Sequence, residues 1–356
     1  MSVVSPKEGR LLLAGDIGGT KTDLAVVSTE AGPRSELVKR RYASADYPGL
    51  AEMARAFLEE SGLEVEAASF DVAGPVLGGT AQLTNLTWRL EETTLAAELG
   101  IHDVWLMNDL VAIASAIPLL QQQELHQVQE GAPAPGGAIA VLAPGTGLGE
   151  AFLTAGERGY LPHASEGGHA GFAPSSELEL DLLQWLWREF DHVSFERVAS
   201  GVGIPNLYDF LRERGEVRES ESLAGELADS TDRTRPIITA ALRQDAPDPL
   251  AAATVELFLN ILGTEAGNLA LKVLATGGVY LAGGIAQALR AQLGTPPFLD
   301  AFTRAGRFRT MLQRLPVYVI MSPEVALLGA ANEGLRLLEA RVRAPAGGRS
   351  KQEQTR

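Results

Sequence analysis

The chain alternates short apolar runs with longer segments that carry apolar residues at helical spacing. The short runs are typical of buried strands and cover Leu11–Ile17, Asp23–Ser28, Ser69–Val72, Asp103–Met107, Ala138–Ala143, Glu150–Thr154, Gly278–Ala282 and Val317–Met321. The longer segments predict helices at Leu50–Ser61, Glu91–Glu98, Leu110–Leu120, Glu177–Phe190, Ala251–Leu274 and Glu324–Val342. Strands that alternate with helices predict an α/β fold.

One local pattern occurs twice. Leu12–Ser28 reads as strand, glycine turn and strand, and Ile139–Thr154 repeats that order. A unit that recurs with further strand and helix material behind it indicates two related halves. The alternative is coincidence, because glycine-rich hairpins are common.

Composition narrows the class of protein. The 356 residues exceed a usual domain of about 100–200 residues, so two domains are expected. The chain has no cysteine, which excludes disulfides, thiolate catalysis and cysteine-based zinc sites and fits a reducing cytoplasm. The net charge of −15 repels nucleic acid and anionic membranes. No apolar run approaches the roughly 18 residues of a membrane span, and no secretory signal is visible.

The first glycine turn has the residues of a phosphate-binding loop. Gly18 and Gly19 allow backbone N–H groups to approach an anion, and the hydroxyl groups of Thr20 and Thr22 add donors. Asp16, at the end of the preceding strand, is placed to hold Mg²⁺ or its waters. The alternative is a plain hairpin whose turn Asp16 caps.

Register excludes two common nucleotide motifs. The P-loop pattern requires a glycine where this chain has Thr20, before Lys21. The second turn, Gly145-Thr146-Gly147-Leu148-Gly149, leads into a strand, whereas a dinucleotide fingerprint opens a helix. Both turns are therefore interpreted as phosphate-binding hairpins. A third pair, Gly283-Gly284, ends a strand and would let a flat base lie close; its alternative is tight packing.

Three further segments carry candidate acid–base and hydroxyl-binding groups. Asn108 and Asp109 lie between a strand and an apolar helix, where a helix cap would explain one of them and a general base with a hydroxyl ligand would explain both. Glu166 and His169 flank two glycines and can bind one small polar ligand; the alternative is a solvated polar loop. Glu196 by itself is indistinguishable from a surface glutamate. The charged stretch 212–249 shows no candidate chemistry.

Taken in order, these segments resemble the bacterial glucokinase family of the actin-like, hexokinase-type ATPase superfamily. The resemblance covers the chain from about Leu11 to Gly334 and rests on the runs GDIGGTKTDLAVV, AGPV, NLTW, LMNDLVAIASAIP, APGTGLGEAF, EGGHAGFAP, ERVASGVGIPNLY, LAGGIA and FLDAFTRAGRF. It implies two actin-like, ribonuclease H-like α/β domains around a cleft. The expected domains are 1–109 with about 323–345, then 110–322, with a disordered tail at 346–356.

The resemblance also implies a reaction and its residues. The reaction is the phosphorylation of D-glucose to glucose 6-phosphate by ATP and Mg²⁺, in the cytoplasm and in a homodimer. Asp109 would be the catalytic base, and the glucose ligands would be Asn108, Asp109, Glu166, His169, Glu196 and, with Gly74-Pro75 shaping the site, Asn85. The ATP ligands would be Asp16, Gly18, Gly19, Thr20, Lys21, Gly145, Thr146, Gly147, Gly283 and Gly284, with Asp16 also near Mg²⁺.

Other classes of function stay open at this point. A sugar- or nucleotide-binding regulator could keep this fold without turnover, but the chain retains Asp109, Glu166 and His169. Another phosphotransferase of the superfamily could use a different acceptor. The repressor–kinase–ORF sugar kinases usually carry a cysteine-rich zinc site, which this chain lacks. Many family members have asparagine where this chain has Lys21, and the role of that lysine stays open.

Overall fold

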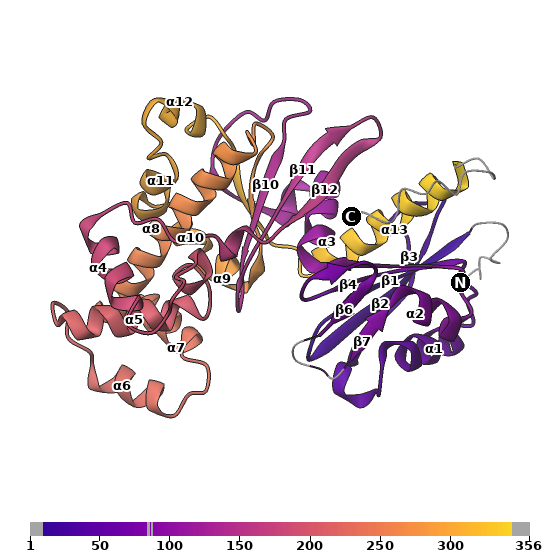
Figure 1. Ribbon diagram of the computed structural model, residues 1–356, viewed down its shortest axis with the longest axis horizontal. Helices are drawn as coiled ribbons and strands as arrows, with labels where there is room; N and C mark the ends of the chain where they lie inside the picture. Colours follow the sequence, from indigo (N-terminus) through magenta and orange to yellow (C-terminus); the bar gives the residue numbers. More distant parts are fainter. Residues whose placement is uncertain (1–9, 84–85, 87, 344–356) are drawn as a thin grey trace. The chain divides into compact units, whose positions relative to one another are not determined.

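The computed structural model describes residues 10–83, 86 and 88–343. The expected glucose ligand Asn85 and the expected tail at 346–356 lie outside the described residues. The chain divides into two compact units, Met1–Leu120 with Ser322–Arg356, and Gln121–Met321, and each is described by itself (Figure 1). Within the described residues, no helix is both long and apolar enough to cross a membrane.

The first unit is built on a five-stranded sheet in the order β3-β2-β1-β4-β8. Its strands are β1 (Leu11–Ile17), β2 (Lys21–Ser28), β3 (Glu36–Ala43), β4 (Ala67–Val72) and β8 (Asp103–Asn108). Strand β1 pairs antiparallel with β2 and parallel with β4. The short strands β5 (Val76–Leu77), β6 (Thr80–Gln82) and β7 (Arg89–Glu91) form a second, small sheet.

Both faces of the five-stranded sheet are covered by helices. On one face Leu13 and Ile17 of β1 pack with α1 (Leu50–Ser61) and α2 (Glu92–Leu99). On the other face Leu12 and Ala14 pack against α13 (Val325–Arg343). Because alternate residues of β1 are buried on opposite sides, the strand reads as a continuous apolar run. The C-terminal helix therefore returns to the first unit, as the family resemblance implies.

The second unit has a six-stranded sheet in the order β12-β11-β10-β13-β14-β9. Its strands are β9 (Leu125–Gln129), β10 (Ile139–Pro144), β11 (Leu148–Gly156), β12 (Gly159–Ser165), β13 (Gly278–Leu281) and β14 (Val317–Ile320). As in the first sheet, three antiparallel strands are followed by two parallel ones. This shared order confirms the prediction of two related halves.

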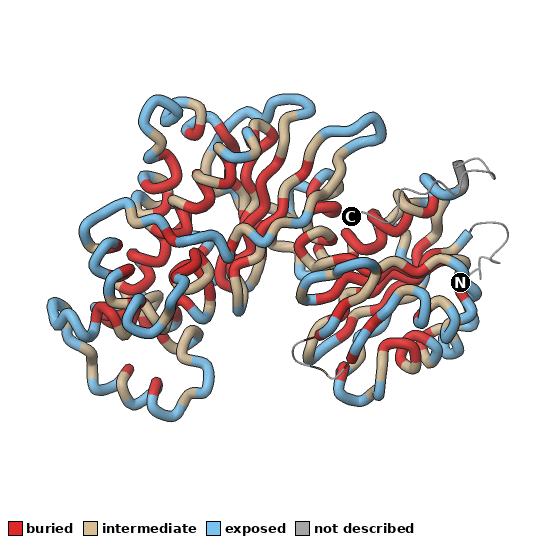
Figure 2. Tube along the Cα trace, in the orientation of Figure 1, coloured by how far each residue is buried: buried red, intermediate tan, exposed pale blue. Residues whose placement is uncertain are grey.

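Helices make up most of the rest of the second unit, and α8 is the longest of them in the described chain. The helices are α4 (Glu177–Leu186), α5 (Gly203–Arg214), α6 (Glu221–Ala228), α7 (Thr234–Ala241), α8 (Pro249–Lys272), α9 (Gly283–Ala288), α10 (Arg290–Leu293), α11 (Pro296–Phe302) and α12 (Arg309–Leu312). Figure 2 shows buried residues concentrated in the central strands and in the facing sides of the helices.

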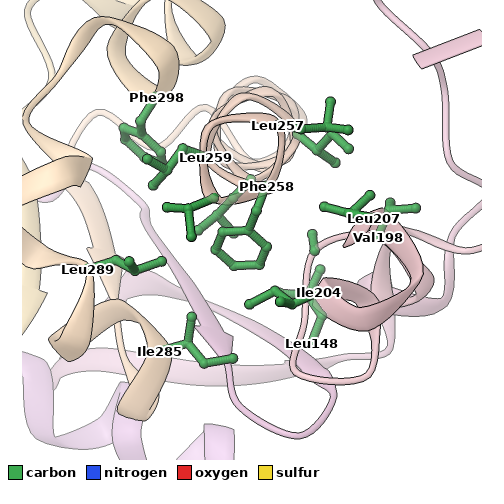
Figure 3. Close-up of a cluster of buried hydrophobic side chains, with 14 of the residues drawn as sticks. Leu148, Val198, Ile204, Leu207, Leu257, Phe258, Leu259, Ile285, Leu289 and Phe298 are labelled. Atoms are coloured by element: carbon green, nitrogen blue, oxygen red, sulfur yellow. The ribbon is translucent and has the colours of Figure 1, made fainter. Parts of the chain in front are cut away.

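The core of the second unit lies directly behind its glycine turns. Phe258 of α8 packs in one cluster with Leu148, Ile204 and Ile285 (Figure 3). Leu148 follows Gly147, and Ile285 follows Gly284. The buried side chain next to each turn fixes the position of the turn's backbone, and a binding site requires such a fixed backbone.

The first unit extends further along the chain than residue 109. Helix α3 (Asp109–Ala116) packs on α13, and Asn332 Nδ2 donates to the Ser115 backbone oxygen at 3.0 Å. A side chain at Gly329 would collide with the Ala112 carbonyl, so glycine is required at this crossing. The contacts of α3 thus place the end of the first unit at Leu120, beyond the boundary after Asp109 expected from the sequence.

Candidate active site

Two aspartates lie side by side at the carboxyl end of the first sheet. Asp16 of β1 and Asp71 of β4 are register partners on adjacent parallel strands. Val72 is in turn the partner of Asn108 on β8, so Asp109 follows at the same edge. The sequence analysis did not identify Asp71, because it lies inside an apolar run. Its position opposite Asp16 at a strand end is the signal that could have found it.

Burial decides the electrostatics of this edge. Asp71 is fully buried, and neither of its carboxylate oxygens has a hydrogen-bond partner within the described chain. Burial, and then the charges of Asp16 and Asp109, raise the pKa of Asp71 well above its usual value. Burial also raises the pKa of Asp16, and the charge of Asp23 adds to that effect. The edge is therefore short of positive charge and suited to a cation.

Of the roles that the sequence left open for Asn108 and Asp109, the structure shows the helix cap. Asn108 is the N-cap of α3: its Oδ1 accepts from the Leu110 N–H at 2.8 Å, and its Nδ2 donates to the Gly74 carbonyl at 2.9 Å. Asp109 Oδ1 also accepts from Leu110 N–H, at 2.9 Å. Burial raises the pKa of Asp109 to about 6; the Leu110 hydrogen bond opposes this rise, and the charge of Asp16 adds to it. Asp109 is thus poised as a base near neutral pH.

The first glycine turn is held by its own backbone and by Ser44. The Gly18 N–H donates to the Lys21 carbonyl at 3.0 Å, and Ser44 Oγ donates to the Gly18 carbonyl at 2.7 Å. A Cβ at Gly18 would meet the Lys21 carbonyl oxygen at 2.6 Å. Thr20 is exposed, as expected for a phosphate donor.

The expectation for Thr22 was wrong. Its side chain is fully buried, and its Oγ1 lies 3.0 Å from Ser44 Oγ, so the hydroxyl group serves the turn's structure. Thr22 points inward because it lies on β2, one position after the exposed Lys21. Successive side chains of a strand point to opposite faces, and this alternation sets the orientation of Thr22. The interpretation of the segment as a turn did not take it into account.

The second glycine turn is fastened to the segment that follows Glu196. The Gly145 N–H donates to the Gly147 carbonyl at 2.9 Å. The Gly201 N–H donates to the Gly145 carbonyl at 2.8 Å, and the Val202 N–H donates to the Thr146 carbonyl at 3.1 Å. Thr146 remains exposed at the tip of the turn.

The three residues expected to bind sugar in the second unit lie together. His169 Nε2 lies 3.9 Å from Glu166 Oε2, and its Nδ1 lies 3.8 Å from Glu196 Oε1. Both separations are longer than a hydrogen bond, so His169 lies between two carboxylates with capacity left for a ligand. Glu166 and His169 are largely exposed, whereas Glu196 is mostly buried. Residues distant in sequence are thus brought to one place.

A cavity of about 1090 Å³ opens beside the second turn. Its lining includes expected residues, Gly145, Thr146 and Gly284. The lining of the cavity also includes a segment for which no functional residue was predicted from the sequence. Its residues are Thr231, Asp232, Arg233, Thr234, Arg235, Ile238, Thr239, Leu242 and Arg243. Thr234 Oγ1 donates to the Gly201 carbonyl at 2.6 Å, which ties this segment to the turn. The cavity has an apolar side, cationic groups and backbone donors, as a nucleotide requires.

Gly283 and Gly284 have different tasks. Gly283 has a φ of +86°, and a Cβ there would meet the Pro144 carbonyl oxygen at 2.8 Å. This is the tight-packing role. A Cβ at Gly284 would meet no atom within 4 Å among the described residues, and Gly284 lines the cavity. Gly284 therefore leaves open space at the wall of the cavity.

Known proteins resemble this chain over most of its length. The glucokinase family model matches residues 13–335. Glucokinase from Nostoc punctiforme is 43% identical over 341 residues, which cover 92% of this chain and 99% of that protein.

Solved structures share the fold. Glucokinase from an Antarctic psychrotroph matches with a TM-score of 0.79 at 28% identity, over 92% of this chain and all of that chain. A glucokinase of the ROK family from Streptomyces griseus, in complex with glucose and AMPPNP, matches with a TM-score of 0.57 at 21% identity, over 92% of this chain and 99% of that chain. The prediction of an actin-like α/β fold is confirmed.

Proposed function

The chain belongs to the glucokinase family, whose reaction is the ATP-dependent phosphorylation of glucose, and we propose that Asp109 is the general base of that reaction. The position of Asp109 supports this role. One of its carboxylate oxygens accepts from the Leu110 N–H, where a strand ends and a helix begins. The pKa of about 6 leaves this carboxyl group ionised at neutral pH and still basic enough to take a proton.

The reaction is an in-line displacement at phosphorus. The 6-hydroxyl oxygen of glucose attacks the γ-phosphorus of ATP, its proton passes to the Asp109 carboxylate, and the bond from the γ-phosphorus to the bridging oxygen breaks. ADP leaves with the electron pair, and glucose 6-phosphate forms. Positioning and charge neutralisation supply most of the acceleration in such transfers.

The residues at the first sheet edge fit a bound Mg²⁺. The described residues contain no group of three or more His, Asp or Glu side chains that could hold a metal alone. Mg²⁺ commonly uses one or two carboxylates together with phosphate oxygens and water. Asp16 would supply a carboxylate or bind a metal-bound water, and the unpartnered oxygens of Asp71 are consistent with an edge that lacks a positive charge. When bound, Mg²⁺ neutralises charge on the phosphates.

The phosphates of ATP would be bound by donors of the glycine turns. In the first turn the donors would be the N–H groups of Gly19 and Thr20 and the Thr20 hydroxyl group, because the Gly18 N–H is bonded to the Lys21 carbonyl. In the second turn they would be the N–H groups of Thr146 and Gly147 and the Thr146 hydroxyl group, because the Gly145 N–H is bonded to the Gly147 carbonyl. Lys21 is exposed at the start of β2 and could contact a phosphate. The cavity beside Gly284 would hold the adenosine, with Ile238 and Ile285 on its apolar side.

Glucose would be held by polar side chains that cover several hydroxyl groups. Glu166, His169 and Glu196 form the cluster of the second unit, and Asn108 retains one amide hydrogen for the sugar beyond its bond to Gly74. A site built from such groups rejects sugars that leave them unpaired. Asn85 stays a proposed ligand from the family resemblance.

A coupled assay for ADP release over a hexose panel tests the substrate assignment. We expect glucose to give a higher kcat/KM than mannose or N-acetylglucosamine, and ATP to outperform polyphosphate and ADP as donor. A higher kcat/KM for mannose would contradict the sugar site as described. A donor preference for polyphosphate would contradict the adenosine cavity.

Assembly and location follow from the family resemblance. A homodimer is proposed, and light scattering on the eluting protein would test it by mass. A cytoplasmic location is proposed because the reaction consumes ATP and because the chain has no cysteine to oxidise. Cell fractionation followed by immunodetection would test it.

A further inference from the structure

A buried glutamate lies beneath the turn that carries Glu166 and His169. Glu150 is on β11, opposite Ser165 of β12 in register, and is 2% exposed. A Cβ at Gly167 would collide with Glu150 Oε2, so the backbone of the turn rests directly on this carboxyl group. The Gly167 N–H donates to Ser165 Oγ at 3.0 Å, which completes the seat of the turn.

A second buried carboxyl group, from α8, is near enough for its charge to act on Glu150. Glu265 is fully buried; its Oε2 accepts from Asn268 Nδ2 at 2.9 Å, and its Oε1 accepts from Lys272 Nζ at 3.3 Å. Glu150 Oε1 is buried and has no hydrogen-bond partner within the described chain. Burial, and then the charge of Glu265, raise the pKa of Glu150 to about 8, while Lys272 opposes the effect.

Charge balance explains what the pair does at neutral pH. Two buried carboxyl groups face Lys272, the cation that acts on Glu150 among the described residues. Glu150 therefore keeps its proton until the pH rises through about 8.

The other elements around Glu150 supply no further buried charge within the described chain. Strand β10 places Leu142 opposite it. On β12, His163 is engaged by Thr154 at 2.8 Å and stacks on Phe152. Glu166 and His169 of the turn itself are mostly exposed.

Two well-packed apolar side chains at positions 150 and 265 would stabilise the fold more, because burying carboxyl groups costs free energy. The direct contact with Gly167 gives the pair a task that two apolar side chains would not perform. The position of the turn over β11 therefore depends on the Glu150 carboxyl group.

We propose that Glu150 is a positioning residue for sugar recognition: its carboxyl group, buried beneath Gly167, sets the place of the turn that presents Glu166 and His169 to glucose. The inference rests on the proposed assignment of that turn to the sugar. When Glu150 loses its proton, its new charge beneath Gly167 is repelled by the charge of Glu265. The turn is displaced, and glucose binds more weakly while ATP binding is unaffected.

The test measures the KM for glucose, the KM for ATP and kcat between about pH 6.5 and 9.5, a range that brackets the loss of the Glu150 proton. In the unmodified enzyme, the KM for glucose rises about fivefold or more above about pH 8, a coupling of ordinary size, and the KM for ATP does not follow it. In Glu150→Gln, which keeps the shape and removes the ionisation, the KM for glucose stays constant over this range. A Glu150→Gln enzyme with the pH dependence of the unmodified enzyme overturns the proposal.

Lys272→Met should shift the pH at which the KM for glucose rises, a change that loss of stability would not produce. Without the ammonium group the pKa of Glu150 is raised further, so the rise in the KM for glucose moves to higher pH. An unchanged or lower midpoint counts against the proposal. If Glu150→Gln does not fold, Glu265→Gln takes its place and is expected to remove the rise as well. Glu179→Gln is the matched control, because Glu179 is 1% exposed but bonds to Ser175; it should keep the rise.

Direct variants of the turn separate this inference from the sugar assignment. Glu166→Gln and His169→Gln should each raise the KM for glucose at every pH. If both leave it unchanged, the assignment of the turn to the sugar is wrong, and the inference falls with it. If both raise it while Glu150→Gln behaves as the unmodified enzyme, only the positioning role is wrong.

Discussion

Glu196 Oε2 accepts a hydrogen bond from the Leu148 backbone N–H at 3.1 Å. A Cβ at Gly147 would collide with the same oxygen, and the other carboxylate oxygen of Glu196 lies 3.8 Å from His169 Nδ1. One side chain thus connects the turn proposed to bind phosphate with the histidine proposed to bind sugar. A glutamate that looked like any surface residue in the sequence holds two parts of the site together.

Replacing Glu196 should therefore affect the sugar more than the nucleotide. In Glu196→Gln the amide oxygen can still accept from Leu148, but the charge beside His169 is lost. We expect the KM for glucose to rise about tenfold or more, since hydrogen bonds to charged groups contribute about 1.5–3 kcal/mol, and the KM for ATP to change less. Initial rates with each substrate varied in turn would measure this, and a larger effect on ATP would contradict it.

Asp109→Asn should lower kcat by about 10²–10⁴ without unfolding the protein, because an amide cannot take the proton from the sugar. The amide oxygen of the new side chain can still accept from the Leu110 N–H, so the start of α3 is kept. Steady-state rates and thermal unfolding would be measured together. Asp248→Asn, which alters another aspartate beside a helix start, is the control and should keep normal turnover. A folded Asp109→Asn enzyme with near-normal kcat removes Asp109 from the role.

The pH dependence of kcat/KM should report the same group. Burial raises the pKa of Asp109 to about 6, and a base must be ionised to act. The value of kcat/KM for glucose should therefore fall below about pH 6, by about tenfold for each further pH unit. A profile that stays flat down to about pH 4.5 would show that the base has an ordinary carboxyl pKa.

Asp71→Asn should make stability less sensitive to pH. The pKa of Asp71 is raised in the folded protein above the ordinary value of 3.8, so the folded state binds more protons than the unfolded state above that pH, and stability falls as the pH rises. The variant lacks this loss. Its free energy of unfolding relative to the unmodified protein should therefore increase as the pH rises above about 4, by about 1.4 kcal/mol for each unit by which the folded pKa exceeds the ordinary value. Urea unfolding without Mg²⁺ would measure it; a constant difference would refute it.

Gly283 and Gly284 offer a matched pair of neighbours. Gly283→Ala should destabilise the fold by about 1–3 kcal/mol, because alanine is strained at positive φ and its Cβ would meet Pro144. Gly284→Leu has open space at the Cβ and extends toward the cavity. It should leave the melting temperature nearly unchanged and raise the KM for ATP about tenfold, the loss expected when a side chain fills part of a ligand pocket. An unaffected KM for ATP would place the adenosine elsewhere.

The sequence was most informative where an element packs closely against the core. Leu11–Ile17 and Leu50–Ser61 coincide with β1 and α1, because a strand or helix that packs against the core must show its apolar pattern. Strands β3 and β12 were missed. Each lies at an edge of its sheet and has no fully buried residue. Because these residues are at least partly exposed to solvent, they do not need to alternate between apolar and polar types.

By itself, the sequence determined the α/β class, the repeated half, and the glycines and carboxyl groups proposed to carry chemistry, since local propensity and turn residues act over a few positions. Tertiary structure alone decided which of these groups meet. It placed Asp71 beside Asp16 through strand register, turned the hydroxyl of Thr22 inward, and brought Thr231–Arg235 to the cavity of the second unit. These relations depend on pairings between distant segments, where burial and approach, rather than residue type, fix what a side chain can do.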